Sequence, residues 1–165
     1  GLIEFFDLPM SNASRGARQQ TNIALRLSRQ AQAVEVAAGI CYEIAYGGSL
    51  RRQAETSGLL LTISNDTWFG GSIGPHQHMQ IAQMRALENG RWLLRASNNG
   101  VTGMVSPRGE ITAGRPRFEA SVLRGEFEVM KGRTPYSTLG DIPALFLLTV
   151  LLVVTAMRSR RTNFS

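Results

Sequence analysis

The residue best suited to covalent chemistry is Cys41, the only cysteine in a chain of 165 residues. It follows the apolar run VEVAAGI (34–40), which predicts a buried β-strand, and it precedes a segment with a helical pattern, 42–54. A tight strand-to-helix turn presents a side chain outward, and the amides and dipole of a following helix favour a thiolate. The position alone fits a nucleophile at such a turn. It fits a buried structural thiol equally well.

Several polar residues that follow this cysteine are candidates for a chemical role. Glu43 falls in the first turn of the predicted helix, where a carboxylate is stabilised and can order the site by hydrogen bonding. We expect Asn65 and Asp66 to turn the backbone of a loop rather than to act in catalysis. His76 and His78 are two residues apart and point away from each other on a helix, so we expect helix entry after a proline and no metal site.

An aromatic pair lies in the glycine-rich stretch NDTWFGGSIGP. Trp68 and Phe69 fit either a core or an exposed, mobile loop, and the flanking glycines favour the loop. An apolar loop tip near a membrane can dip into lipid. Further along, Arg85, Glu88 and Arg91 are three residues apart along one helix, which indicates ion pairs that support the fold more than substrate contacts.

The composition limits the class of protein. Basic residues number 18 against 12 acidic ones, for a net charge of +6, and Lys131 is the only lysine. No basic block interleaved with aromatics appears, so we expect no nucleic-acid partner. A single cysteine excludes a disulfide framework and a cysteine-rich zinc site. The length suits one domain with a substantial core.

The pattern of elements predicts a layered α/β domain. Expected strands are 34–40, 59–64, 92–97, 101–106, 111–114 and 121–129, and expected helices are 42–54 and 76–89. The run NNG (98–100) between two strands predicts a hairpin.

The C-terminal segment 142–157, IPALFLLTVLLVVTAM, contains no charge over 16 residues. A buried core helix and a transmembrane helix both fit, and the cluster RSRR that follows favours a span with the basic end in the cytoplasm. We therefore expect a domain at 1–138, a transmembrane helix at 139–158 and a basic cytoplasmic tail at 159–165.

Several motifs occur together in one order: CYE, SNDTWFG, RALENGR and SNNG, preceded by FFDLP and SRG. In this combination the chain resembles the nitrilase superfamily and, more narrowly, the C-terminal part of the apolipoprotein N-acyltransferase family. The resemblance implies a fold that is part of an αββα sandwich, followed by the C-terminal transmembrane helix. It places the catalytic domain in the periplasm of a bacterium, on the inner membrane.

The resemblance also implies a reaction. Cys41 matches the nucleophile, which takes an acyl chain from a membrane phospholipid, typically phosphatidylethanolamine, as a thioester. The acyl group then passes to the N-terminal amine of diacylglyceryl-modified lipoproteins, and no cofactor is needed. Tyr42 and Glu43 match residues that support the site, and Trp68 and Phe69 match an aromatic loop beside the lipid-facing cleft.

One departure from the family pattern stands out. The family uses a glutamate and a lysine upstream of the cysteine, but no lysine precedes Cys41 here, and neither Glu4 nor Glu35 lies in a matching context. We expect the chain to be a piece of a longer protein, nearly inactive alone. A nitrilase-superfamily amidase and a catalytically dead, membrane-tethered scaffold remain as alternatives.

Overall fold

The computed structural model describes residue 17, residues 20–26 and residues 32–162, with side-chain burial given as far as Ser159. The FFDLP and SRG motifs therefore lie outside the described residues. Within the described part, six strands form one mixed sheet in the sequential order β1 to β6. The strands are β1 (Ile23–Leu25), β2 (Val34–Ile40), β3 (Leu59–Asn65), β4 (Leu93–Asn98), β5 (Thr102–Val105) and β6 (Ile111–Arg115).

The middle of the sheet is parallel and its margins are antiparallel. Strand β3 pairs in parallel with both β2 and β4, in registers that match Ile40 with Ile63 and Asn65 with Asn98. The β1–β2, β4–β5 and β5–β6 pairs are antiparallel. Because parallel strands end at the same edge, the residues that follow β2, β3 and β4 meet there. The predicted NNG hairpin joins β4 to β5, and Asn99 adopts a left-handed conformation with φ 55°.

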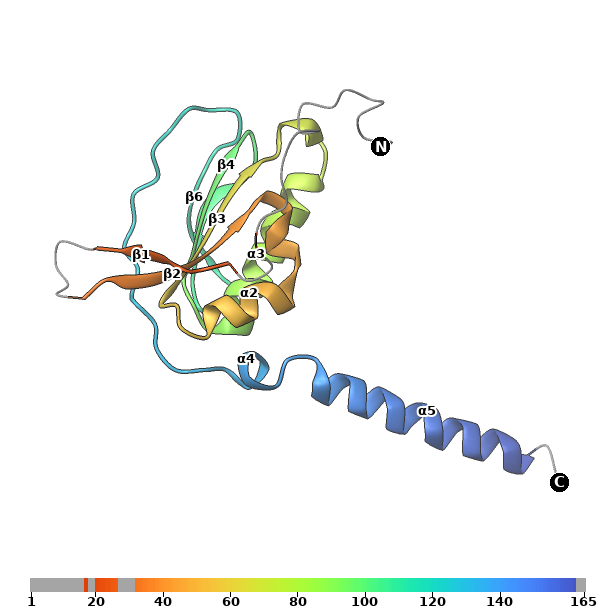
Figure 1. The fold of residues 1–165 in the computed structure, drawn as a ribbon. Coiled ribbons are helices and arrows are strands. Elements are labelled where there is room, and N and C mark those ends of the chain that lie inside the picture. The colour runs from red at the N-terminus through yellow and green to blue at the C-terminus, as the bar shows by residue number, and fades with distance from the viewer. Residues whose placement is uncertain (1–16, 18–19, 27–31, 163–165) are drawn as a thin grey trace.

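Two helices cover one face of the sheet (Figure 1). They are α2 (Gly47–Ala54) and α3 (Gly74–Asn89), and α3 ends where Gly90 takes φ 60°. Their apolar side chains pack against strand residues such as Ala37, Leu60 and Leu93, all fully buried, to form the main core. This sheet with its helix layer corresponds to part of an αββα sandwich, as predicted.

The other face of the sheet is crossed by the 116–134 segment, which has no regular secondary structure (Figure 1). Phe127 and Val129 pack there against a second apolar cluster that contains Val34, Val36 and Leu59. The prediction of a strand at 121–129 is therefore wrong. The segment lies across the sheet face, and its side chains bury apolar surface without joining the strand ladder.

The helix predicted at 42–54 is also wrong in its middle. A 3-10 helix, η1 (Cys41–Ala45), comes first, and α2 starts only at Gly47. Tyr46 between them has φ −85° and ψ 78°, which is not helical, and two glycines follow it. The short η1 carries little of the dipole that was expected to act on the cysteine.

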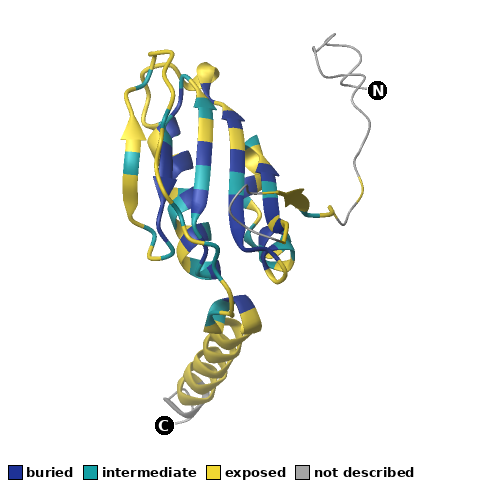
Figure 2. Cartoon of the chain, turned by 90° about the vertical axis from the view of Figure 1, so that its left-hand side faces the viewer, coloured by how far each residue is buried: buried dark blue, intermediate teal, exposed yellow. Residues whose placement is uncertain are grey.

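The chain then leaves the sheet through α4 (Pro135–Leu139) and continues as α5 (Ile142–Thr162). Helix α5 projects away from the domain, and its described side chains are exposed along its length (Figure 2). The window Ile142–Ser159 has a mean hydropathy of 2.0 and none of it is buried, so this helix is long and apolar enough to cross a membrane. Within the described residues, α5 is not buried in the core of this domain.

Candidate active site

The candidate site lies at the edge where the parallel strands end. Cys41 follows β2 directly, Asp66 follows β3, and the Asn98–Asn99 turn follows β4. In open α/β sheets this edge is where ligands bind. The topology thus brings together residues that are far apart in the sequence.

Cys41 occupies the turn from β2 into η1 in a conformation rare for a residue with a side chain. Its φ is 53°, in the left-handed region, while Ile40 before it is extended with φ −94° and ψ 121°. Such a conformation is costly for a non-glycine residue and persists where the surroundings hold it. The cysteine is partly buried, and Ile40 and Tyr42 beside it are exposed. The predicted tight turn is confirmed, although a 3-10 helix follows it.

Glu43 fastens this turn through the backbone. Its Oε2 accepts a hydrogen bond from the amide of Ile40 at 2.8 Å, so the bond spans the turn that contains Cys41. The carboxylate itself is exposed. The interaction is the ordering role foreseen for Glu43, and it leaves one carboxylate oxygen for other contacts.

A buried charged network lies beneath the turn and was not foreseen. Asp66 is fully buried, and its two oxygens contact His78 Nδ1 and Arg95 Nη2, each at 2.9 Å. The other ring nitrogen of His78, Nε2, lies 3.2 Å from the carbonyl oxygen of Cys41. Arg95 Nη2 also donates to Ser64 Oγ at 2.9 Å. One member of the network, His78 of α3, therefore contacts the backbone of Cys41, and Asp66 links it to Arg95 of β4.

The charges of this network support one another. Burial opposes ionisation of Asp66, but the His78 hydrogen bond and the Arg95 charge outweigh it, so the pKa of Asp66 is lowered. Burial lowers the pKa of Arg95, while the negative charges of Asp66 and of an ionised Cys41 oppose that shift. The Asp66 carboxylate is therefore stabilised in its ionised form between its two partners.

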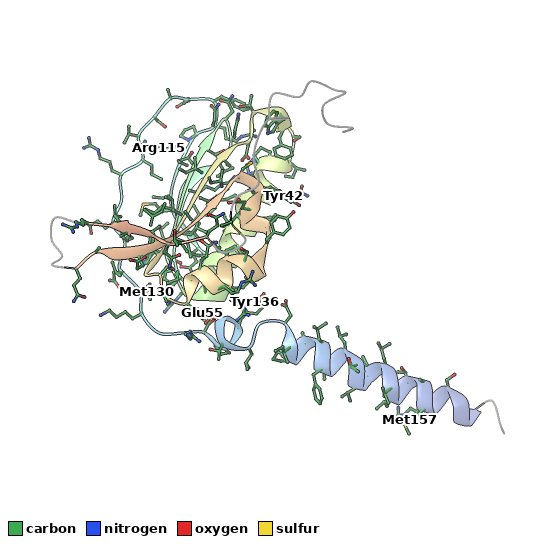
Figure 3. The ribbon with its side chains drawn as sticks, viewed as in Figure 1. Tyr42, Glu55, Arg115, Met130, Tyr136 and Met157 are labelled. Carbon is green, nitrogen blue, oxygen red and sulfur yellow. The ribbon has the colours of Figure 1, made fainter. Side chains whose placement is uncertain are left out.

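The aromatic loop is exposed, as predicted. Residues 67–69 form the short helix η2 (Thr67–Phe69), in which the side chain of Trp68 is 77% exposed and that of Phe69 is 42% exposed. Asn65 Oδ1 accepts from the amide and hydroxyl of Thr67 at 3.2 and 2.6 Å. Tyr42, in η1, also lies on the outside (Figure 3).

This loop is tied to the rest of the edge by one arginine of the 116–134 segment. Arg117 donates to the carbonyl oxygen of Gly70 at 2.5 Å and to that of Asn99 at 3.1 Å. Its guanidinium also lies 4.6 Å from the ring centroid of Phe118. The expectation of a loop that turns through Asn65 is confirmed. Arg117 fastens this loop at Gly70, and the mobility expected of it stays a prediction.

The two arginines singled out in the sequence, Arg85 and Arg91, have structural partners. Arg85 pairs with Glu88 at 2.8 Å, as predicted for fold support. Arg91 lies beyond the end of α3 and donates to the carbonyl oxygens of Ser57 and Gly132, each at 2.7 Å, so the expected run of three on one helix is wrong for Arg91. His76 is exposed and His78 is buried, so the two histidines point apart.

With the site described, comparisons with known proteins add the family. The Carbon-nitrogen hydrolase family matches residues 8–132. Apolipoprotein N-acyltransferases of Pseudomonas paraeruginosa and Azotobacter vinelandii are each 50% identical to the chain, over 153 and 163 residues. These matches cover 93% and 99% of this chain but only 29% and 30% of the relatives. The chain therefore spans under a third of the length of these curated relatives.

A more distant relative and a solved structure complete the comparison. The apolipoprotein N-acyltransferase of Vibrio vulnificus is 45% identical over 163 residues, covering 98% of this chain and 31% of that protein. Among solved structures, a mutant of the Nesterenkonia AN1 amidase from the nitrilase superfamily has a TM-score of 0.46 at 18% identity. That match covers 65% of this chain and 42% of the amidase.

Proposed function

The chain belongs to the carbon-nitrogen hydrolase family, and from this premise we propose that it supplies the nucleophile of a membrane-bound N-acyltransferase. The observation that carries the proposal is Cys41, held at φ 53° where β2 ends, above a buried network of opposite charges. The names of its relatives support acyl transfer to apolipoproteins. The proposed donor is a membrane phospholipid such as phosphatidylethanolamine.

The proposed reaction has two steps. The Cys41 thiolate attacks the ester carbonyl of the phospholipid, a C–S bond forms, the C–O bond breaks, and the released alkoxide takes a proton. The α-amine of a diacylglyceryl-modified N-terminal cysteine then attacks the thioester. A C–N bond forms, the C–S bond breaks, the amine loses a proton, and the sulfur is released as thiolate.

The proton transfers require a base, commonly worth about 10²–10⁴-fold in rate. Two carboxylates near the turn already have partners: Glu43 holds the amide of Ile40, and Asp66 is buried between His78 and Arg95. We therefore assign the base and an oxyanion-stabilising cation to a glutamate and a lysine upstream of Cys41, as the resemblance to the family implies.

The lipid-facing side of the site is proposed from exposed apolar surface. Trp68, Tyr42 and Tyr46 are exposed by 77%, 60% and 63%, and all follow strand ends at the same edge. Aromatic side chains with a polar tip suit a membrane interface. Helix α5 would anchor the domain, with residues 1–138 in the periplasm, the span at 139–158, and the tail at 159–165 in the cytoplasm.

The test is the intact mass of the complete gene product after incubation in detergent with phosphatidylethanolamine and no acceptor. We expect an adduct of fatty-acyl mass that hydroxylamine removes and that is missing in Cys41→Ala. Adding a diacylglyceryl peptide with a free amine should discharge the adduct. A folded protein that carries no adduct, with a glutamate and a lysine both present upstream, would contradict the phospholipid donor; release of ammonia from small amides would then favour the amidase.

A further inference from the structure

The contact between His78 and the backbone of Cys41 is not explained by the proposed chemistry. His78 is 5% exposed, and its Nε2 lies 3.2 Å from the Cys41 carbonyl oxygen rather than facing the sulfur as a general base would. A carbonyl oxygen only accepts hydrogen bonds, so Nε2 must carry the hydrogen for this contact to be favourable. The histidine therefore acts on the conformation of the cysteine.

The turn at Cys41 needs such a support. A residue with a side chain at φ 53° is strained unless its neighbours hold it. Two contacts reach the backbone at this point: the exposed Glu43 carboxylate holds the amide of Ile40, and the buried His78 ring holds the carbonyl of Cys41. Of the two, the contact made by His78 is shielded from water.

The orientation of the ring is itself set by buried charges. His78 Nδ1 lies 2.9 Å from Asp66 Oδ1, and Asp66 Oδ2 accepts from Arg95, so this carboxylate faces donors on both sides. The two ring nitrogens thus both face acceptors, and the ring makes both bonds at once when each nitrogen carries a hydrogen. Arg95 and Asp66 leave the ring little freedom to turn away from Cys41.

We propose that His78 is a positioning residue that donates from Nε2 to the carbonyl oxygen of Cys41 and so holds the nucleophile in its reactive turn. The importance of that turn for acyl transfer rests on the proposed function. The hydrogen bond and its effect on the thiol do not, so they are tested without an acyl donor.

The experiment compares two amide substitutions by their effect on alkylation of Cys41. Glutamine at position 78 places an N–H near Nε2, toward Cys41, whereas asparagine places one near Nδ1, toward Asp66. In the complete gene product, the rate of iodoacetamide alkylation at Cys41 is followed by peptide mass. We expect His78→Gln to stay within about threefold of the unsubstituted protein and His78→Asn to be about tenfold slower, the loss expected for one hydrogen bond.

The control is His76→Gln, an exposed histidine two residues away on α3, which should leave the alkylation rate unchanged. Equal rates for the two variants at position 78, or a slower rate for His78→Gln, would overturn the proposal, because a purely structural histidine does not distinguish them. A protein that forms no acyl adduct yet keeps the expected order of rates would refute only the proposed function.

A measurement on the unsubstituted protein covers the case in which neither variant folds. The ring ¹⁵N resonances of His78, assigned by through-bond correlation to its own backbone, report which nitrogen carries hydrogen. A hydrogen on Nε2 at neutral pH is the expected result. A bare Nε2 would overturn the proposal.

Discussion

At the residue scale, the candidate chemistry depends on how the backbone of Cys41 is held. The thiol is partly buried at φ 53°. Glu43 of η1 holds the amide of the preceding residue, and His78 of α3, itself bonded to Asp66, contacts the carbonyl oxygen of Cys41. Asp66 and Arg95 carry opposite charges, and their contact offsets part of the cost of burying them. The side chain of Cys41 itself stays available for a substrate.

Glu43 could hold the amide of Ile40 or act in the reaction through its charge, and substitutions separate these two roles. If it only holds the amide of Ile40, Glu43→Gln keeps an acceptor and should retain the rate of acyl-adduct formation within about threefold. Glu43→Ala removes the acceptor and should slow adduct formation about tenfold or more. The measurement is the time course of intact mass with phosphatidylethanolamine.

The opposite pattern would assign chemistry to the carboxylate. A Gln variant as slow as the Ala variant would mean that the negative charge of Glu43 is needed, as a base or to stabilise a cation. Glu55→Gln is a suitable control, since this glutamate pairs with Arg133 at 3.2 Å on the surface, away from Cys41 in sequence.

Sequence reasoning singled out Cys41 as the candidate nucleophile but missed the buried groups that support its turn, for a physical reason. Cys41 is marked by local features, a buried strand before it and a turn after it. His78 and Arg95 act across separations of 37 residues to Cys41 and 29 residues to Asp66, and no local pattern records such contacts. The signals available in the sequence were a histidine within the predicted helix 76–89 and an arginine within the predicted strand 92–97.

At the element scale, the strands were easier to predict than the helices. Parallel strands buried on both faces produce apolar runs, so β2 and β3 were found to within a residue. The helix after Cys41 was predicted as one piece because its apolar spacing continues through Tyr46, whose backbone is not helical. The extended 121–129 stretch has strand-like composition but packs on a sheet face, which only tertiary structure decides.

The β4–β5 hairpin is packed closely against the buried network, which gives a prediction for Gly100. A Cβ added there would lie 2.2 Å from Asp66 Oδ2 and 2.2 Å from Ser97 Oγ. We expect Gly100→Ala to lower the free energy of unfolding by about 1–3 kcal/mol, as overpacking of a core does. Adduct formation should slow as well, because Asp66 must shift. Denaturant unfolding in detergent, followed by tryptophan fluorescence, measures the change.

Gly71 is the matched control, since a Cβ there meets nothing within 4 Å. Gly71→Ala should therefore leave both unfolding and adduct formation nearly unchanged. An unaltered stability in Gly100→Ala would mean that the hairpin moves away from Asp66 without cost.

At the scale of the whole molecule, two parts of different character meet at α4. The domain buries its apolar residues between the sheet and its coverings, whereas α5 exposes leucines, valines and a phenylalanine around its circumference, with Met157 near its far end (Figure 3). Water disfavours such a surface. The uncharged run 142–157 of α5 extends about 24 Å, somewhat less than a hydrocarbon core of about 30 Å, and flanking interfacial residues can make up the difference.

This geometry predicts how α5 responds to a charge placed along it. With residues 139–165 inserted as a guest segment in a host membrane protein, glycosylation-tag reporters should show that most chains span the membrane. Val150→Arg places a charge near the middle of the apolar window, which costs about 2.5–3.5 kcal/mol and should reduce the spanning fraction about 70- to 370-fold relative to the non-spanning one. Met157→Arg, beside the basic cluster that begins at Arg158, should have little effect because its side chain reaches the interface. Equal losses in both variants, or none in either, would mean that α5 lies on the membrane surface or packs against protein.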